Sequence, residues 1–352
     1  MKKRFTRNIT LFAVGLLTLV LHSSCNREQE HNTIPETDPQ VADLAPSGEL
    51  ATDSPVVSKK PKSPTPNTST PEKRPEEIRF MAYNVENYLE MSRYVNGERS
   101  VTTKPEAEIV ALVNVIVAAK PDILGICEIG TIEDLKDLQS RLRNSGLDLP
   151  HHHHTGGDDP TRRLALLSKH PITPHEISAP LEYPINGGKV KMGRSILDAT
   201  VTIGDNYSLR LLGVHLKSKR EVRDMDQAEM RKNEALLLRR HATAILEENP
   251  DINLLVYGDL NETKNNSPIQ IVRGAGEEKN HLEDIYLRDD RGTTWTHNWK
   301  YADIYSRFDY VLMSRGVRPE VDFKASYIPA TPDVSEASDH RPLVVTLTPV
   351  DQ

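Results

Sequence analysis

The amino-acid sequence predicts an α+β fold, a four-layer α/β/β/α sandwich of two mainly antiparallel sheets with helices outside. Short apolar segments with strand character predominate between residues 77 and 350. Segments with helical spacing of apolar residues interrupt them in pairs, and no internal repeat is visible. Such a pattern favours two packed sheets covered by helices within a single domain.

The predicted strands are short apolar runs, and most of them end in polar residues. They are the segments 78–85, 121–129, 164–172, 195–203, 207–218, 253–261, 307–314 and 341–350. Three segments have the spacing of helices, namely 105–120, 131–146 and 224–250. Pro105 lies near the first turn of the first helix. In the second, Thr131 and Asp134 have capping-box spacing, and Gly146 marks the end.

The first 76 residues are expected to lie outside this domain. Residues 1–24 combine the basic start MKKRFTRN with the apolar run ITLFAVGLLTLVL, which is typical of an export signal and too short to span a bilayer. Residues 26–76 contain nine prolines and no aromatic residue. Such a segment cannot bury enough apolar surface to fold, so we expect residues 25–76 to be a disordered, semi-extended tether.

The two cysteines have different expected roles. Cys25 follows small residues and resembles the lipidated cysteine of a bacterial lipoprotein signal, which predicts a lipid anchor in a membrane of the cell envelope. His22 stands where such signals usually carry Leu, so a plain secretory signal and a soluble exported protein remain the alternative. Cys127 lies in the apolar run ILGICEI, and we interpret it as a small buried hydrophobic residue.

Composition limits the possible partners. The chain of 352 residues has 27% charged residues and a net charge of −7. This mild acidity gives no overall electrostatic reason to bind nucleic acid, although a local basic patch would still allow it. No protein partner is evident from the sequence.

Polar residues recur at the ends of the predicted strands. They include Asn84, Asn87, Glu128, His215, Lys217, Ser218, Asp259, Asn261, Glu262, Arg307, Asp309, Asp339 and His340. A single pair such as Asp339–His340 would be common in a turn. Because strand ends of stacked sheets converge at one rim, where a cleft can form, six such clusters predict a shared site.

These residue types suit the hydrolysis of a phosphate ester. Glu128 and Asp339 can supply oxygen ligands to Mg²⁺ or Mn²⁺, with Asn84 as a neutral third ligand. Asp259 is a suitable base for the attacking water. The amide of Asn261, two residues further along an extended segment, can donate to the transition state.

Two imidazoles are expected on the reacting phosphate. His340 can bind or protonate a phosphoryl oxygen if a partner fixes its tautomer, and Asp309 is the candidate partner. His215 offers the second imidazole.

The ordered set NVEN, CE, HLKS, GDLNE, RFDY and SDHRP, from Asn84 to Pro342, resembles the endonuclease/exonuclease/phosphatase superfamily, which has the DNase I-like fold. The resemblance implies a metal site at Asn84, Glu128 and Asp339, and places the other five residues named above around the water and the phosphate. HLKS together with NVEN is more similar to the secreted nuclease-like branch than to the abasic-site repair branch. Cys127 stands where many relatives have Gln, and we expect this to be tolerated in the core.

Several other residues have both a functional and a structural interpretation. Arg194 and Lys217 are lower-ranked candidates for substrate binding, and Arg162 and Arg163 could serve the phosphate or only the surface. Lys217, Lys219, Arg220 and Arg223 could form a phosphate-backbone patch or a solvated face. Trp295 and Trp299 are interpreted as packing residues rather than a substrate-covering loop, and His151–His154 as an exposed loop rather than a metal site.

The resulting hypothesis is an exported phosphodiester hydrolase that depends on Mg²⁺ or Mn²⁺, with nucleic acid as substrate and broad specificity. A phosphomonoesterase or a phospholipid phosphodiesterase, acting on inositol phosphates or sphingomyelin-like lipids, is the alternative because loops set the substrate on a shared fold. A non-catalytic surface binding module is an alternative of another class.

Overall fold

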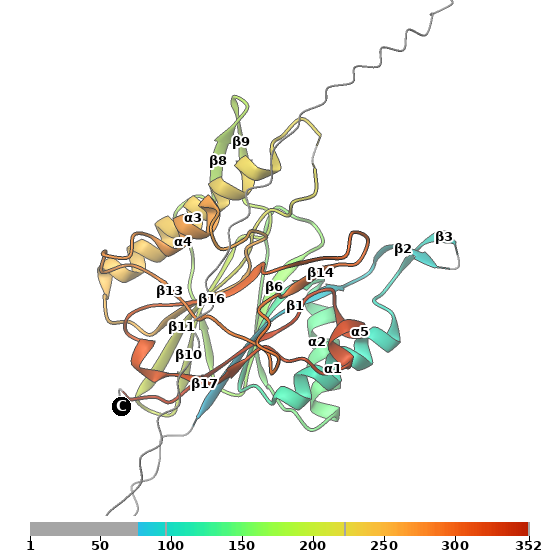
Figure 1. Ribbon diagram of the computed structural model, residues 1–352, viewed down its shortest axis with the longest axis horizontal. Helices are drawn as coiled ribbons and strands as arrows, with labels where there is room; N and C mark the ends of the chain where they lie inside the picture. Colours follow the sequence, from blue (N-terminus) through green and yellow to red (C-terminus); the bar gives the residue numbers. More distant parts are fainter. Residues whose placement is uncertain (1–76, 96, 222, 351–352) are drawn as a thin grey trace, which may run out of the picture. The chain divides into compact units, whose positions relative to one another are not determined.

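The computed structural model describes residues 77–95, 97–221 and 223–350, so the predicted export signal, tether and Cys25 lie outside the described residues (Figure 1). Two six-stranded sheets organise the described chain. The first has the order β17-β18-β1-β4-β6-β5, from Val321–Tyr327, Leu343–Leu347, Ile78–Tyr88, Ile123–Ile129, Arg163–Ser168 and His151–Thr155. The second has the order β13-β16-β12-β11-β10-β7, from Glu283–Asp284, Asp309–Met313, Leu254–Asp259, Tyr207–His215, Ile196–Ile203 and Ile172–Pro174.

Strand pairing within the two sheets is mainly antiparallel, as the sequence predicts. Only the central pairs β1–β4 and β11–β12 run parallel among the strand pairs of these two sheets in the described chain. A parallel pair needs a long crossover connection. The helices supply it, because α1 connects toward β4 and α3 connects β11 to β12.

Helices cover the outer face of each sheet, which completes the predicted four layers (Figure 1). Helices α1 (Glu106–Ala119), α2 (Ile132–Asn144) and α5 (Asp333–Ala337) pack on the first sheet, where Met81 and Leu124 meet Leu112. Helices α3 (Gln227–Glu248) and α4 (Ser267–Arg273) pack on the second. The predicted capping box of α2 is confirmed, with Thr131 and Asp134 each accepting from the other's backbone N–H.

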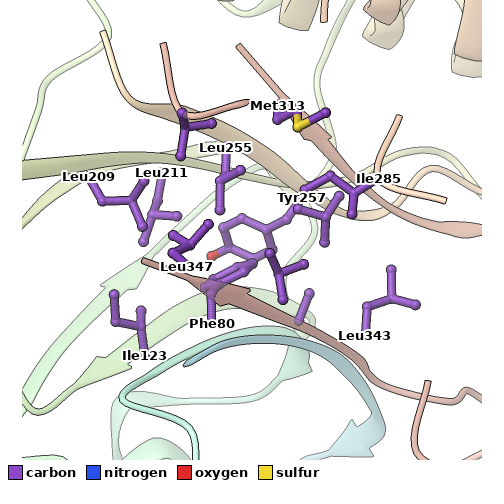
Figure 2. Packing of buried hydrophobic residues seen from close by; sticks show 14 of the residues in the cluster. Phe80, Ile123, Leu209, Leu211, Leu255, Tyr257, Ile285, Met313, Leu343 and Leu347 are labelled. Carbon is purple, nitrogen blue, oxygen red and sulfur yellow. The ribbon is translucent and has the colours of Figure 1, made fainter. Parts of the chain in front are cut away.

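The inner faces of the two sheets form the central core, which Figure 2 shows around Tyr257 and Phe80. Their rings meet edge to face with centroids 5.0 Å apart. The Tyr257 ring also fills the space over two glycines, because a Cβ at Gly125 or Gly213 would clash with it. Cys127 lies in this core at 2% exposure, which confirms its interpretation as a buried hydrophobic residue.

Three short hairpins extend from the sandwich. They are β2–β3 (Met91–Val95 and Glu98–Thr102), β8–β9 (Glu182–Ile185 and Gly188–Lys191) and β14–β15 (His297–Trp299 and Ile304–Ser306). No pattern singled out in the sequence predicts these hairpins. None of the described helices combines the length and the apolar character that a membrane span requires.

Two local predictions were wrong. Segment 164–172 is not one strand, because β6 ends at Ser168 in the first sheet and β7 begins at Ile172 in the second, with Pro171 at the crossing. Proline interrupts sheet pairing because it has no backbone N–H. His151–His154 form no loop but edge strand β5, which pairs antiparallel with β6.

Candidate active site

Sheet geometry explains why six distant motifs meet. β1 and β4 are parallel neighbours, so Asn84 and Glu128 lie at the same edge of the first sheet. β11 and β12 are also parallel, and His215 is the register partner of Asp259. β16 runs antiparallel to β12 and begins at this edge, which pairs Asp259 with Asp309. Asp339 and His340 precede β18, which runs antiparallel to β1.

Strained backbone directs two of these side chains. Glu128 has a φ of 66° at a bulge where the β4–β6 register shifts between Cys127 and Ile129. The bulge breaks the alternation, since Cys127 faces the core between the sheets and Ile129 faces the helices. Asn261 has a φ of 51°, so a left-handed turn, rather than the predicted extended segment, brings its amide to Asp259.

Asp259 is the centre of the site, and its side chain is 2% exposed. Its Oδ1 accepts from the backbone N–H of Asn261 at 2.8 Å. Its Oδ2 accepts from the side-chain amides of Asn84 at 3.2 Å and Asn261 at 3.1 Å. Burial raises the pKa of Asp259 to about 7 against the opposing charge of His340. A carboxylate that titrates near neutral pH is well matched to a general base.

The predicted Asp309–His340 pair is present. His340 Nδ1 lies 2.7 Å from Asp309 Oδ2, and its Nε2 lies 3.7 Å from Asp259 Oδ2. Burial alone would lower the pKa of His340, but the charges of Asp309 and Asp259 outweigh it and raise that pKa well above its usual value. The two carboxylates therefore favour the protonated form of His340, whose Nε2 is directed toward the centre of the site.

His215 is the second imidazole at this point. Its Nε2 lies 3.5 Å from Asp259 Oδ2 and 3.8 Å from Glu128 Oε1. Its Nδ1 is buried without a hydrogen-bond partner among the described residues. Burial lowers the pKa of His215 well below its usual value, and nearby cations lower it further, namely Arg194, His340, Arg162 and Lys217. These side chains therefore contribute positive charge in the neighbourhood of His215.

The predicted metal ligands lie around the end of β1. Glu128 Oε2 accepts from the backbone N–H of Asn87 at 3.0 Å, and the backbone N–H of Asp339 donates to Glu86 at 2.8 Å. Asp339 Oδ2 lies 3.7 Å from His297 Nε2, and Asp339 Oδ1 lies 3.9 Å from His340 Nε2. In the described chain, Asp339 therefore belongs to a compact group with His297 and His340, and Glu128 does not.

The side-chain types of Glu128, Asp339 and Asn84 suit a divalent cation. Carboxylate and amide oxygens are the ligands that Mg²⁺ prefers. The amide oxygen of Asn87, beside Glu128, is buried and has no hydrogen-bond partner in the described part of the chain. An oxygen atom that accepts no hydrogen bond from the described residues is suited to face a cation or its bound water.

Glu86 and His297 also reach the site, although neither is among the residues predicted from the sequence. The Glu86 carboxylate binds the Asp339 backbone, and Glu86 follows Asn84 by two residues, so the motif NVEN could have indicated it. His297 forms an isolated β-bridge with His340 and stacks on Phe308 at 5.1 Å between ring centroids. No strand-end pattern marks His297, because β14 is only three residues long.

The basic residues that the sequence offered as lower-ranked phosphate contacts lie in different places. Of these, Arg162 lies closest to the site, with Nε 3.7 Å from Glu128 Oε2. Arg194 is 9% exposed and lies 3.1 Å from Asp159, and Arg163 donates to the Gly157 carbonyl on an exposed edge. Lys219 is held by Glu262 at 2.5 Å, which leaves it less available for a phosphate-backbone patch.

Trp295 and Arg341 have structural roles in this region. The Arg341 guanidinium lies 4.3 Å from the centroid of the Trp295 ring, and it pairs with Asp289 at 2.9 Å. Trp295 thus packs as predicted. Trp299 is 52% exposed on the β14–β15 hairpin, so its interpretation as a packing residue was wrong.

Comparison with known proteins agrees with this architecture. The profile of the Endonuclease/Exonuclease/phosphatase family matches residues 81–340. No relative was found among curated protein sequences. Among solved structures, an endonuclease/exonuclease/phosphatase from Beutenbergia cavernae has 19% identity and a TM-score of 0.52, over 78% of this chain and 72% of its own.

Two further structures are similar at the same TM-score of 0.52. Truncated TDP2 of Caenorhabditis elegans is 17% identical over 78% of this chain and 98% of its own. The human nocturnin catalytic domain, solved with a bound sulfate anion, is 18% identical over 77% of this chain and 93% of its own. At such identities the likeness concerns the fold alone. The family profile, however, covers well over half of the sequence, so the chain belongs to the Endonuclease/Exonuclease/phosphatase family, whose enzymes hydrolyse phosphate esters.

Proposed function

We propose that the protein is a phosphodiesterase that uses Mg²⁺ or Mn²⁺ and acts on nucleic acid with broad specificity. The observation that carries this proposal is the convergence on Asp259. Its Oδ2 lies between 3.1 and 3.7 Å from nitrogen atoms of four side chains, those of Asn84, His215, Asn261 and His340. A base, two imidazoles and two amides therefore face one point, as attack on a phosphate requires.

The side chains divide the chemistry between them. Asp259 accepts the proton of the attacking water, since its pKa is near neutral. His340 and His215 hold the phosphoryl oxygens, and Asn261 donates its amide to the developing charge. Asn84, Glu128 and Asp339 would hold the divalent ion, which would polarise the phosphoryl oxygen when bound.

A polymeric anion is supported by the cations beside the centre. The charges of Arg162, Arg194 and Lys217 each lower the pKa of His215, and of these three Arg194 is already paired with Asp159. Cations that line a cleft can follow a phosphate backbone beyond the reacting group. A phosphomonoesterase or a phospholipid phosphodiesterase would need only the central position, so substrate size is the property to test.

Hydrolysis by the purified protein tests the proposal directly. Plasmid DNA, RNA, bis-p-nitrophenyl phosphate and p-nitrophenyl phosphate are offered side by side with Mg²⁺ or Mn²⁺, and EDTA serves as the control. We expect metal-dependent cutting of the nucleic acids. Hydrolysis of p-nitrophenyl phosphate alone would establish a monoesterase, and hydrolysis of both small esters without nucleic acid would indicate a lipid or inositol phosphate substrate.

Asp259→Asn is expected to lower kcat on bis-p-nitrophenyl phosphate by about 10²–10⁴-fold, because it removes the base while keeping the shape of the side chain. Asp205→Asn, in an exposed turn, is the matched control and should retain full activity. If Asp259→Asn retained wild-type kcat with an unchanged melting curve, another residue would have to be the base.

We also propose that the enzyme is exported and tethered to a membrane of the cell envelope through a lipid on Cys25. The support is the sequence pattern of residues 1–25. Cys25→Ala is expected to move the protein from the membrane fraction to the soluble fraction of the producing cells, as measured by immunoblotting. Retention of this variant in the membrane would show that the apolar run itself is the anchor, and a wild-type protein in the soluble fraction would favour the plain secretory signal.

A further inference from the structure

A pocket of about 240 Å³ lies directly beside the metal-site carboxylate Asp339. The β14–β15 hairpin, the segment that contains Arg291, and α5 form its walls. Asp339 belongs to both the pocket and the active site, and its neighbour Ser338, which also lines the pocket, contacts the backbone of Asn84. Ser338 donates to the Asn84 carbonyl at 2.8 Å, and the Asp339 carbonyl accepts from the Asn298 backbone at 2.9 Å. A group bound in the pocket would therefore lie next to the reacting phosphate.

The charges of the inner pocket wall neutralise each other. Arg341 and Asp289 form an ion pair of 2.9 Å, and their side chains are 3% and 5% exposed. The Arg341 guanidinium also covers one face of the Trp295 ring. These buried charges balance each other, so the charged groups at the mouth determine what the pocket attracts.

The mouth carries two available cations, Arg291 and Lys300. Both residues are exposed, and neither has a carboxylate partner within 4.0 Å among the described residues. Lys300 Nζ makes only a weak contact of 3.4 Å with the Ser335 carbonyl of α5. The Asp290 carboxylate, next to Arg291 in the chain, borders a different groove. Asp339 is the remaining acid of the pocket, and it faces the metal-site side.

We propose that this pocket is a subsite for a second phosphate group, joined through one sugar-sized unit to the phosphate that reacts. This inference rests on the proposed function, because the reacting phosphate must lie beside Asp339. Arginine and lysine at a pocket mouth are suited to phosphate oxygens, with arginine able to bind two of them. The volume lies below the roughly 300–1,000 Å³ of sites for drug-sized ligands, so it suits one sugar-phosphate unit.

The same chemistry exists in two kinds of substrate, a neighbouring nucleotide or a second phosphate on an inositol ring. Rates are therefore compared within two pairs. The first pair is a dinucleotide with a terminal phosphate, on the 5′ or the 3′ end, and the same dinucleotide without it. The second pair is an inositol bisphosphate and an inositol monophosphate. A preference for the phosphate-bearing member identifies the source, and equal, measurable rates on both members of each pair would overturn the proposal.

The variants Arg291→Ala, Lys300→Ala and their combination test the two cations. We expect the double variant to lower kcat/KM at least tenfold more for the preferred substrate than for its partner without the phosphate, mainly through KM. Lys324→Ala, an exposed lysine that borders the other groove, is the matched control and should change neither value by more than twofold. An equal loss on both substrates would show that the cations act through the fold or the metal site instead.

Equilibrium binding separates this inference from the proposed function. The phosphate-bearing dinucleotide and the inositol bisphosphate are titrated into the protein in EDTA, where no turnover is expected. Weaker binding of either ligand to the double variant than to wild type and Lys324→Ala would support the subsite even if the protein hydrolysed none of the substrates. Equal binding of both ligands by all three proteins would overturn it, whatever the turnover.

Discussion

Glu128 and Asp259 show how single residues obtain their chemistry from their surroundings. Glu128 lies at a bulge within β4 with a φ of 66°, and its carboxylate is directed toward His215. Asp259 follows Gly258, whose φ of 130° and close approach to the Val214 carbonyl exclude a side chain. The glycine in GDLN is therefore required by the backbone, while the following carboxylate is available for catalysis.

Asp309→Asn should lower kcat by about 10²–10⁴-fold, because the amide neither fixes the tautomer of His340 nor stabilises its charge. The carboxylate raises the pKa of His340 in the folded protein. The stabilisation that this pair gives the folded protein is thus complete below the pKa of His340 in the unfolded chain, about 6.5. It is lost as the pH rises through the higher pKa of His340 in the folded protein. NMR titration of His340 in the metal-free protein should show a lower pKa in the variant. An unchanged titration would refute the proposed coupling.

At the scale of elements, the last residues of β1 and the segment that joins β1 to α1 together prepare the metal site. Glu86 and Asn87 have φ values of 48° and 54°, an unusual pair of left-handed residues. Arg93 of β2 donates to the Asn87 carbonyl at 2.7 Å, and Lys104 donates to the Glu86 carbonyl at 3.0 Å. Lys104 is 2% exposed, so a buried cation stands behind the acidic ligands.

Lys104→Met is expected to weaken Mn²⁺ binding by at least about tenfold, which equals roughly 1.4 kcal/mol. Burial raises the pKa of Glu86, and Lys104 opposes this; Lys104 also helps to keep the pKa of Asp339 low. Without the cation both carboxylates hold protons to higher pH, so the loss should be larger at pH 6 than at pH 8. Calorimetric titration with Mn²⁺ at the two pH values measures this loss of affinity. Lys104→Arg should restore most of the affinity, and failure of this rescue would indicate a purely steric role.

At the scale of the whole sandwich, the site depends on the distance between the two sheets. Tyr257 of the second sheet extends over Gly125 of the first and beside Phe80. Glu128 follows Gly125 on β4, and Asp259 follows Tyr257 on β12. The contact that spaces the sheets therefore lies on the two strands that carry an acid of the first sheet and the base of the second.

Gly125→Ala should lower the free energy of unfolding by about 1–3 kcal/mol, because the added methyl group would clash with the Tyr257 ring. Urea denaturation measures this change. Gly276→Ala is the matched control, since a methyl group there meets open space, and it should alter stability by less than about 1 kcal/mol. Equal stability of the two variants would show that the sheets adjust their spacing freely.

The sequence alone determined the features that depend on short-range patterns. Apolar runs with polar ends predicted the two sheets, and the spacing of Thr131 and Asp134 predicted the start of α2. The ordered motifs also identified residues that the structure brings together, including the Asp309–His340 pair. These features are readable because periodicity, capping and strand ends are local properties of the chain.

Tertiary structure alone decided the features that depend on partners far apart in sequence. His151–His154 became a strand because β6 supplied hydrogen-bond partners at an open sheet edge. His297 entered the site through a bridge to His340, and the pocket beside Asp339 exists only where a hairpin, a loop and α5 meet. No local pattern specifies such contacts, because their free energy comes from groups that only the packed sandwich brings together.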